Sequence, residues 1–287
     1  MLCKLRRSLS LALFLGSSPL LSAQCITEVS YLERPHFKIQ TGSATYLYDM
    51  AGGGFSSIRD RTGVEWIGYK PGDARVPQSA AADFRGLPNL VFGGEDNGCG
   101  HPGFDKCVSQ RLAADRILTR SKSGKWIWQW TFSESGARLE ISRTDSSRNY
   151  WFLYEGIPGG SFDPEKQFWG TDTDGHRSDT PPIGSDSTGS GNWKWACFGH
   201  GKIKRCFYVV HLTPDDKRDN FSYMGSGPEG VASSDGMVVF GLGRDGVSPL
   251  LNGPNSFFIG FMDYDAPHEE LPGLLEKHIS QLIFVPE

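Results

Sequence analysis

The sequence lacks the signatures of several large protein classes. Beyond residue 23 it contains no run of about 18 uninterrupted apolar residues, so no membrane-spanning helix is expected. It has no Cys-x-x-Cys pair, which argues against a cysteine zinc site. It also has no GxSxG, HExxH or P-loop motif, and these absences argue against serine hydrolases, zincins and nucleotide-binding enzymes.

The chain also has no excess of positive charge, since 33 acidic residues outnumber 29 basic ones. Residues 1–23 have the layout of a secretory signal peptide: basic residues, an apolar run at residues 11–16, and small residues that favour cleavage after Ala23. Cleavage would remove three basic residues and no acid, changing the formal charge from −4 to −7. We therefore expect a secreted or periplasmic protein that does not bind nucleic acid, with residues 24–287 forming a single domain.

Glycine, proline and aromatic residues are abundant, with 36 Gly, 17 Pro and 18 Phe. This composition is typical of many strands joined by demanding turns. In KWIWQWTF, residues 125–132, large apolar side chains occupy every second position, and the alternation resumes at residues 137–142 after a turn. The pattern predicts an antiparallel hairpin with one buried and one solvated face, and its tryptophans are more typical of a core than of a sugar-stacking platform.

The same reasoning predicts an all-β protein, an antiparallel β-sandwich with long polar loops. The further strands are expected at residues 44–48, 55–59, 64–69, 204–212, 237–242, 257–261 and 281–285. A helical pattern occurs at residues 268–280, where Pro272 limits its length. The largest polar loop is expected at residues 156–191, and such loops on β scaffolds commonly meet ligands.

Five cysteines remain beyond residue 23, and export favours disulfides. The segment WACFGHGKIKRCFY is typical of a hairpin, and a two-residue turn at Gly201 and Lys202 would place Cys197 directly opposite Cys206. Cys99 and Cys107 could close a small loop. We therefore expect the disulfides Cys197–Cys206 and Cys99–Cys107.

The segment GGGFSSIRDRTGVEWIGY, followed by FRGLPNLVFGG, resembles the start of the galactose-mutarotase-like β-supersandwich proteins. The resemblance covers roughly residues 36–160 and implies a carbohydrate-handling fold of the supersandwich type. It also implies that Arg85 and Asn89 bind sugar. The histidine-bearing strand of the epimerases has no counterpart, because NYWFLYEGIPGG stands in its place, and this departure argues against mutarotase activity itself.

The loop GEDNGCGHPGF, residues 94–104, presents His101 and Asn97 in a segment too polar for a core. On one interpretation the ring of His101 bonds a loop carbonyl and Asn97 caps a turn. On the other, His101 exchanges protons, since its unperturbed pKa is about 6.5. With Tyr154, Asn97 and Arg85, it would provide a catalytic set for β-elimination of a uronate-containing polysaccharide.

The leading hypothesis is therefore a polysaccharide lyase acting on a polysaccharide or oligosaccharide. Further substrate-binding candidates border the polar loops: Asn89, Tyr150, Glu155, Trp169, His176, Arg177 and Arg244. A glycoside hydrolase would need two carboxylates, for which Glu95, Asp96, Glu155 and Asp174 are available. A non-catalytic carbohydrate-binding or envelope protein is the third alternative.

One short motif bears on cofactors. Asp172 and Asp174, followed by Gly175, have the alternate spacing of oxygen ligands in a calcium loop. The later glutamate of an EF-hand is missing, so the motif is more typical of a turn. No cofactor is expected, and Asp172 and Asp174 are the candidates should calcium bind.

Overall fold

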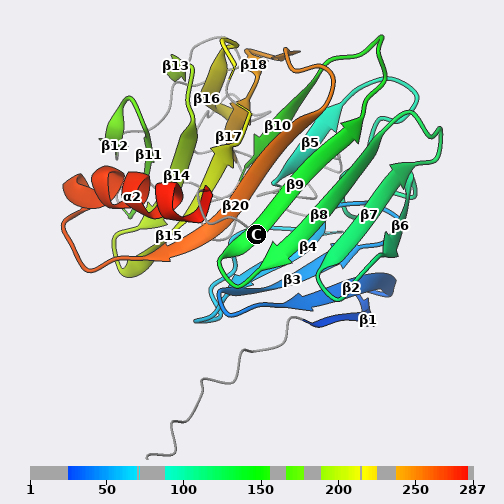
Figure 1. Ribbon diagram of the computed structural model, residues 1–287, viewed down its shortest axis with the longest axis horizontal. Coiled ribbons are helices and arrows are strands. Elements are labelled where there is room, and N and C mark those ends of the chain that lie inside the picture. The colour runs from blue at the N-terminus through cyan, green and yellow to red at the C-terminus, as the bar shows by residue number, and fades with distance from the viewer. Residues whose placement is uncertain are drawn as a thin grey trace, which may run out of the picture.

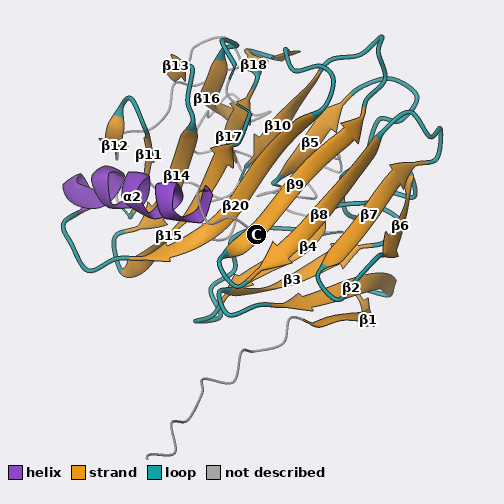
Figure 2. Cartoon of the chain, viewed as in Figure 1, coloured by secondary structure: helices purple, strands orange, loops and turns teal. Residues whose placement is uncertain are grey.

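A computed structural model of the protein describes residues 25–69, 71, 88–155, 166–177, 189–213, 215–224 and 237–283 (Figure 1). The described strands form three main antiparallel sheets and a two-stranded ribbon of β18 (Arg244–Asp245) and β19 (Ser248–Pro249). In Figure 2 a nine-stranded sheet lies in front, and five-stranded and four-stranded sheets lie behind its upper and lower parts. Apolar side chains of all three sheets meet in one core. The predicted all-β antiparallel sandwich is confirmed.

Neighbouring strands in each main sheet pair in antiparallel fashion. The nine-stranded sheet has the order β12 (Gly175–Arg177), β11 (Gln167–Thr171), β14 (Trp195–His200), β15 (Ile203–His211), β20 (Asn255–Asp263), β9 (Gly136–Arg143), β8 (Ile127–Ser133), β7 (Arg116–Ser121) and β6 (Cys107–Arg111). The five-stranded sheet has the order β13 (Gly189–Gly191), β16 (Asp219–Met224), β17 (Met237–Leu242), β10 (Tyr150–Tyr154) and β5 (Asn89–Phe92). The four-stranded sheet has the order β1 (Cys25–Tyr31), β2 (Arg34–Gln40), β3 (Ala44–Asp49) and β4 (Phe55–Asp60).

The tryptophan-rich hairpin is confirmed as β8 and β9. Trp126, Trp128 and Trp130 are all buried, and Phe92 of β5 stacks on Trp126 with ring centroids 3.7 Å apart. Large aromatic side chains bury 150–250 Å² each, which makes such contacts a principal source of core stability. These tryptophans hold the sheets together and are not an exposed sugar platform.

The β14–β15 hairpin forms with the predicted two-residue turn, but its register differs from the prediction. Gly199 pairs with Cys206, because two residues of β15 bulge out after the turn. Cys197 therefore lies opposite Tyr208, and the prediction that it directly faces Cys206 is wrong.

Neither predicted disulfide is present in the structure. The cysteines of the described residues are free thiols: Cys25, Cys99, Cys107, Cys197 and Cys206. The thiol of Cys99 donates to the carbonyl of Lys106 at 3.3 Å and contacts the thiol of Cys107. Burial raises the pKa of Cys206 to about 12, so this thiol stays protonated and packs as a small apolar group.

Two predicted strands are replaced by other structure. Residues 64–69 follow β4 as irregular chain with a single bridge, because the carboxylate of Glu65 accepts the N–H groups of Ile58 and Ile67 at 2.8 and 3.3 Å. Residues 281–283 end the helix α2 (Leu271–Ile283) instead of beginning a strand. Pro272 is tolerated there because it lies in the first turn, where its N–H has no partner to lose.

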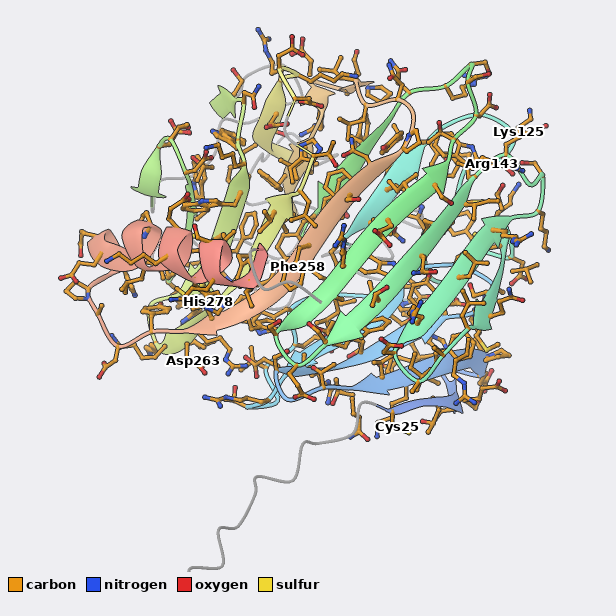
Figure 3. The ribbon with its side chains drawn as sticks, viewed as in Figure 1. Cys25, Lys125, Arg143, Phe258, Asp263 and His278 are labelled. Atoms are coloured by element: carbon orange, nitrogen blue, oxygen red, sulfur yellow. The ribbon has the colours of Figure 1, made fainter. Side chains whose placement is uncertain are left out.

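Helix α2 covers part of the nine-stranded sheet on the side away from the core, after the short 3-10 turn η3 (His268–Glu270) (Figure 3). Leu271, Leu275 and Ile279 are buried against that sheet. The hydroxyl of Tyr208 lies 3.2 Å from Nε2 of His278, which Figure 3 labels on the helix. None of the helices in the described ranges has the length and apolar character that crossing a membrane requires.

The polar loop at residues 94–104 is held by the carboxylate of Asp49, at the end of β3. Oδ1 accepts the N–H groups of Ala51 and Gly52, both at 3.0 Å. Oδ2 accepts the N–H of Gly103 and Nε–H of Arg34, both at 2.8 Å. One buried carboxylate thus ties the loop to the β3–β4 turn and to β2.

The triple glycine before β4 lets this loop lie directly on the backbone. A Cβ at Gly52 would collide with the carbonyl oxygen of His101, and a Cβ at Gly54 with that of Gly100. Gly53 has a φ of 73°, the left-handed region that glycine tolerates best. The glycines are therefore required by close packing between the turn and the loop.

We expect Asp49→Ala to lower the free energy of unfolding by on the order of 3 kcal/mol, because it leaves three N–H groups and Arg34 without their acceptor. Burial pushes the pKa of Asp49 up, but hydrogen bonds from Arg34, Gly103 and Gly52 outweigh it and hold the pKa below its usual range. The contribution of ionised Asp49 to the free energy of unfolding should thus be complete above the unfolded pKa of about 3.9. It should disappear as pH falls through the pKa that Asp49 has in the folded protein.

Urea unfolding at several pH values checks this expectation. The control is Asp105→Ala, which removes an exposed partner of Arg34 at 2.8 Å and should cost less than about 1 kcal/mol. Equal losses for the two variants would contradict the role given to Asp49.

Candidate functional site

The five-stranded sheet has an outer face that points away from the core. On β10, Phe152 and Tyr154 belong to the core, so Trp151, Leu153 and the following Glu155 point to the other side. The register extends this face across the neighbouring strands. Its polar members, which we call the outer-face cluster, are Trp151, Glu155, Asn220, Ser222 and Arg244.

The cluster lies beside a small apolar patch. Leu153 and Val239 are buried in contact with each other, and Val91 and Trp151 pack against them partly exposed. Asn220 pairs with Gly241, and Ser222 pairs with Val239, so the polar strand β16 borders the apolar strands. Apolar surface next to directed polar groups is the usual make-up of a small-molecule site.

Arg244 is brought over this face by a tight turn. Gly243, just before it, has a φ of 67°, and a Cβ there would collide with the side chain of Leu251. The N–H of Arg244 donates to the carbonyl of Arg218 at 2.8 Å. The side chain then runs over Gly241, where a Cβ would come within 2.7 Å of Arg244 Cδ. Glycine is therefore required at positions 241 and 243 for the side chain of Arg244 to lie over the sheet.

The guanidinium of Arg244 is tightly oriented. Nη1 donates to Asn220 Oδ1 at 3.2 Å, to Ser222 Oγ at 3.1 Å and to the Val239 carbonyl at 3.3 Å. Its central carbon lies 5.7 Å from the centroid of the Trp151 ring, within the range of a cation–π interaction. The charge is consequently fixed in position relative to the sheet.

This charge is also desolvated, since Arg244 is 1% exposed and Glu155 is 6% exposed. Burial lowers the pKa of Arg244 to about 10, and the negative charge of Glu155 opposes that shift. Arg244 therefore stays protonated at neutral pH. Two buried charges are seldom explained by stability alone, so Arg244 and Glu155 are candidate functional groups on this face.

Two buried donors in the cluster have no acceptor among the described residues: Asn220 Nδ2 and Trp151 Nε1. Asn220 Oδ1 accepts from Arg244, which fixes the orientation of the amide and leaves Nδ2 as a donor. A buried donor without a partner costs about 1–3 kcal/mol. Oxygen atoms of a ligand could remove that cost, so these donors mark a place for an acceptor-rich molecule.

His101 does not belong to this cluster. It is 8% exposed, its Nδ1 lies 3.2 Å from the carbonyl of Cys99, and its ring lies 6.1 Å from that of Phe104. Burial lowers its pKa to about 4, against the opposing effect of its backbone hydrogen bonds. The ring is therefore neutral at neutral pH, and its contact with a loop carbonyl fits the loop-organising interpretation. A catalytic role of His101 stays a prediction.

Three other predicted residues have structural roles. The hydroxyl of Tyr154 lies in the core, donates to the Trp66 carbonyl at 3.0 Å and has a pKa raised by burial. Tyr150 is fully buried, and its hydroxyl donates to the Gly253 carbonyl at 3.1 Å. Asn89 is fully buried and donates to the Gly53 carbonyl at 2.9 Å. The alternation of β10 turns both tyrosines toward the core, which corrects their assignment to a site.

The remaining candidates are also dispersed. Trp169 is buried and stacks on Phe221 with centroids 4.4 Å apart. Oδ2 of Asp174 accepts from Thr171 Oγ1 and Trp193 Nε1, both at 3.0 Å. Oδ1 of Asp172 accepts the N–H of Lys194 at 3.1 Å. These carboxylates brace a turn, and among the described residues no group of three or more potential ligands could hold a metal.

The structure describes few or no side-chain contacts for the last four candidates. Asn97 is exposed and lies in a turn, and its backbone N–H donates to the Gly94 carbonyl at 3.2 Å. His176 and Arg177 lie on the short strand β12, paired with Gly170 and Trp169, and their side chains are outside the described part. Arg85 is outside the described residues. Among the predicted site residues whose side chains the structure describes, Glu155 and Arg244 lie close enough to interact electrostatically.

Sequence reasoning missed Asn220 and Ser222. The strand β16 that carries both was not predicted, although Asn220, Phe221 and Ser222 alternate polar, apolar and polar. Only one side chain of that triplet enters the core, which is a weak hydrophobic signal. The alternation itself was the signal that could have found the strand.

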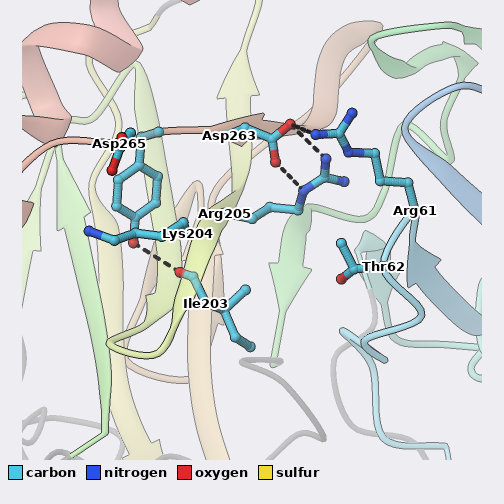
Figure 4. A pocket seen from close by; sticks show the side chains of 8 residues that line it. Arg61, Thr62, Ile203, Lys204, Arg205, Asp263 and Asp265 are labelled. Atoms are coloured by element: carbon cyan, nitrogen blue, oxygen red, sulfur yellow. Dashed lines mark hydrogen bonds and ion pairs between the residues drawn. The ribbon is translucent and has the colours of Figure 1, made fainter.

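A separate cavity of about 520 Å³ lies where the turn after β4 meets β15 and β20 (Figure 4). Asp263 accepts from Arg205 Nε at 2.7 Å and Nη2 at 2.8 Å, and it also pairs with Arg61. Arg205 further donates to the Ser43 carbonyl at 3.1 Å. These charges satisfy one another and connect the four-stranded and nine-stranded sheets, so we do not assign a ligand to this cavity.

We expect Arg244→Met to lower the free energy of unfolding by about 3 kcal/mol, because it leaves the side chains of Asn220 and Ser222 without their buried donor and removes a charge that interacts with Glu155. The double variant Glu155→Gln/Arg244→Met should lose less than the sum of the two single losses, because the two charges interact. Urea unfolding of the wild type, both single variants and the double variant measures the coupling. Additive losses would contradict an electrostatic interaction between Glu155 and Arg244.

The sequence matches no family model and no curated protein. Solved structures do resemble it. The protein HI1317 is 9% identical with a TM-score of 0.53, covering 85% of this chain and 98% of its own. YeaD of Salmonella typhimurium, which carries a provisional mutarotase assignment, is 9% identical with a TM-score of 0.52, covering 84% and 94%. A galactose mutarotase-like protein from Lactobacillus casei, 9% identical, has a TM-score of 0.47 and covers 79% and 100%. The chain has the galactose-mutarotase-like β-supersandwich fold, as the sequence resemblance predicted.

Proposed function

We propose that this protein is a carbohydrate-active enzyme that binds a uronate-containing saccharide on the outer face of the five-stranded sheet and cleaves it by β-elimination. The observation that carries the proposal is the desolvated guanidinium of Arg244 beside two donors that have no acceptor among the described residues, Asn220 Nδ2 and Trp151 Nε1. The fold shared with a structure assigned as a mutarotase supports a carbohydrate ligand.

The chemistry of the cluster suits an acidic sugar. A uronate carries a carboxylate and several hydroxyl oxygens, which can accept from the amide of Asn220 and the indole of Trp151. The positive charge of Arg244 favours an anionic ligand in a place where little water screens it. The half-buried ring of Trp151 and the adjacent Val91 offer an apolar surface to the C–H groups of a pyranose.

β-Elimination fits this cluster as follows. Neutralising the uronate carboxylate makes the C5 proton more acidic, and this is the role we give to Arg244. A base removes that proton, the C5–H electron pair forms a C4=C5 double bond, and the glycosidic C4–O bond breaks. The leaving oxygen then takes a proton. Within the outer-face cluster Glu155 is the group that can exchange a proton.

Glycoside hydrolysis fits less well. It needs two carboxyl groups about 5–9.5 Å apart, one on each side of the bond that breaks. The outer-face cluster supplies one, Glu155. Elimination requires charge neutralisation and proton transfer, for which a single arginine and a single carboxylate suffice. This difference favours elimination.

The test uses the mature protein, residues 24–287, with acidic polymers such as polygalacturonate and alginate and with a neutral glucan as control. We expect ultraviolet absorbance from unsaturated products with an acidic polymer alone. Arg244→Met should lower kcat/KM at least about tenfold, the equivalent of about 1.4 kcal/mol, because the carboxylate loses its counter-charge. Arg138→Met, an exposed arginine on β9, should leave activity unchanged.

The possible outcomes are distinct. Reducing ends without absorbance would replace elimination with hydrolysis. Saccharide binding without either product would make the protein a non-catalytic binder. Full activity of Arg244→Met would remove the outer-face cluster from the mechanism, and the absence of any saccharide binding would overturn the proposal.

We also propose that the protein is exported and that its first 23 residues are removed. The basic residues, the apolar run and the small residues before Gln24 support this. After expression of the full chain in a Gram-negative host, the intact mass of the periplasmic protein should correspond to an N-terminus at Gln24. Ala23→Arg should block cleavage. Recovery of the uncleaved wild-type chain from the cytoplasm would contradict export.

A further inference from the structure

Asp219, the first residue of β16, is a buried carboxylate that bridges two segments of backbone. Its Oδ1 accepts the N–H of Gly243 at 2.7 Å, and its Oδ2 accepts the N–H of Trp193 at 2.6 Å. Gly243 lies in the turn between β17 and β18, whereas Trp193 lies between β13 and β14. Both oxygens are thus used to hold chain segments that meet near the outer face.

The neighbours of these bonded residues belong to the outer-face cluster. Arg244 directly follows Gly243, and Asn220 directly follows Asp219. Asn220 Oδ1 accepts from Arg244 Nη1 at 3.2 Å. Two consecutive residues therefore fix Arg244 at both ends, Asp219 through the preceding backbone and Asn220 through the guanidinium.

A carboxylate is the group that this position requires. Each of its oxygens accepts one N–H, so both donors are satisfied. An asparagine would turn its NH₂ group toward one of the two N–H donors, and that hydrogen bond would be lost. The turn at Gly243 would then be held less firmly, and the direction in which Arg244 leaves the backbone would become less defined.

Ionisation of Asp219 carries a cost in stability. Burial raises its pKa to about 7, the charges of Asp215 and Asp172 add to the shift, and the N–H groups of Trp193 and Gly243 oppose it. Because the folded pKa lies above the unfolded value of about 3.9, ionised Asp219 lowers stability progressively as pH rises from about 4 to about 7. The charged side chain is retained at a cost in stability.

The other charged groups on the elements packed around Asp219 are Asp172, Asp174, Lys194, Asp215, Lys217, Arg218, Arg244 and Asp245. The side chains of Asp174, Lys217, Arg218, Arg244 and Asp245 have hydrogen bonds of their own. None of them is bonded to the carboxylate of Asp219, which within the described residues accepts from backbone N–H groups. Its role is therefore to fix backbone and not to neutralise a cation.

We propose that Asp219 is a positioning residue that holds the Gly243 turn and thereby sets the place of the Arg244 guanidinium on the outer face. The consequence for saccharide affinity rests on the proposed function. The positioning itself can be measured without any ligand.

The experiment compares wild type, Asp219→Asn and Asp245→Asn, all as the mature protein. In ¹⁵N-labelled protein at mildly alkaline pH, the Nε–H resonance of Arg244 is identified by its loss in Arg244→Met. We expect Asp219→Asn to shift or broaden this resonance. Asp245→Asn, which removes an exposed neighbouring carboxylate paired with Arg218, should leave it unchanged.

Binding of an oligouronate gives the second readout. Asp219→Asn should weaken binding at least about tenfold, or about 1.4 kcal/mol, and should weaken it no further in an Arg244→Met background, because Asp219 acts through Arg244. Thermal unfolding verifies that the variants fold. Asp219→Ser, which keeps one acceptor, replaces Asp219→Asn if that variant does not fold.

The outcomes separate the two proposals. An unchanged Arg244 resonance in folded Asp219→Asn overturns the positioning role, whether or not the wild type binds saccharide. Additive losses in the double variant overturn the claim that Asp219 acts through Arg244. A shifted resonance in a protein that binds no saccharide supports positioning and overturns the proposed function.

Discussion

The alternation of side chains along the strands of the five-stranded sheet determines which face of that sheet the outer-face cluster occupies. Phe152 stacks on Phe257 with centroids 4.6 Å apart, and the Tyr154 ring lies 4.6 Å from that of Phe207. These contacts lock one face of β10 into the core. A register slip of one residue would bring Trp151 and Glu155 inward, so the aromatic packing itself fixes the outer-face cluster.

Two buried carboxylates organise backbone in this fold, and their surroundings give them opposite effects on stability. Asp49 accepts three N–H groups and pairs with Arg34, so its pKa is lowered and its ionised form stabilises the fold. Burial raises the pKa of Asp219, and the two N–H groups that it accepts do not offset this, so its charge costs stability. A carboxylate that costs stability beside a desolvated arginine is more readily explained by a function than by folding.

The sequence predicted those parts of the fold that depend on local periodicity. The tryptophan hairpin has a strict period of two and a polar turn, and both were found where expected. The β14–β15 register was wrong because a bulge after the turn depends on packing and is invisible in the spacing of Cys197 and Cys206. Glu155 and Arg244 were predicted to bind substrate, and the neighbouring Tyr154 was predicted to be catalytic. Deciding which of two adjacent residues faces the core requires knowing which layer covers the strand.

The fold by itself does not locate the chemistry. The resemblance to the mutarotase-like proteins implied that Asn89 would bind sugar, yet Asn89 donates to the carbonyls of Gly53 and Gly100 and so joins the triple-glycine turn to the loop at residues 94–104. An amide satisfied by two carbonyls has no donor left for a ligand. In Asn220 the oxygen accepts from Arg244, and both N–H groups of Nδ2 are left without an acceptor among the described residues. If the proposed function holds, comparing these two buried asparagines moves the saccharide contacts from the glycine-rich loop to the outer face of the five-stranded sheet, because an unsatisfied donor, and not the position of a motif, is what a saccharide oxygen can recognise.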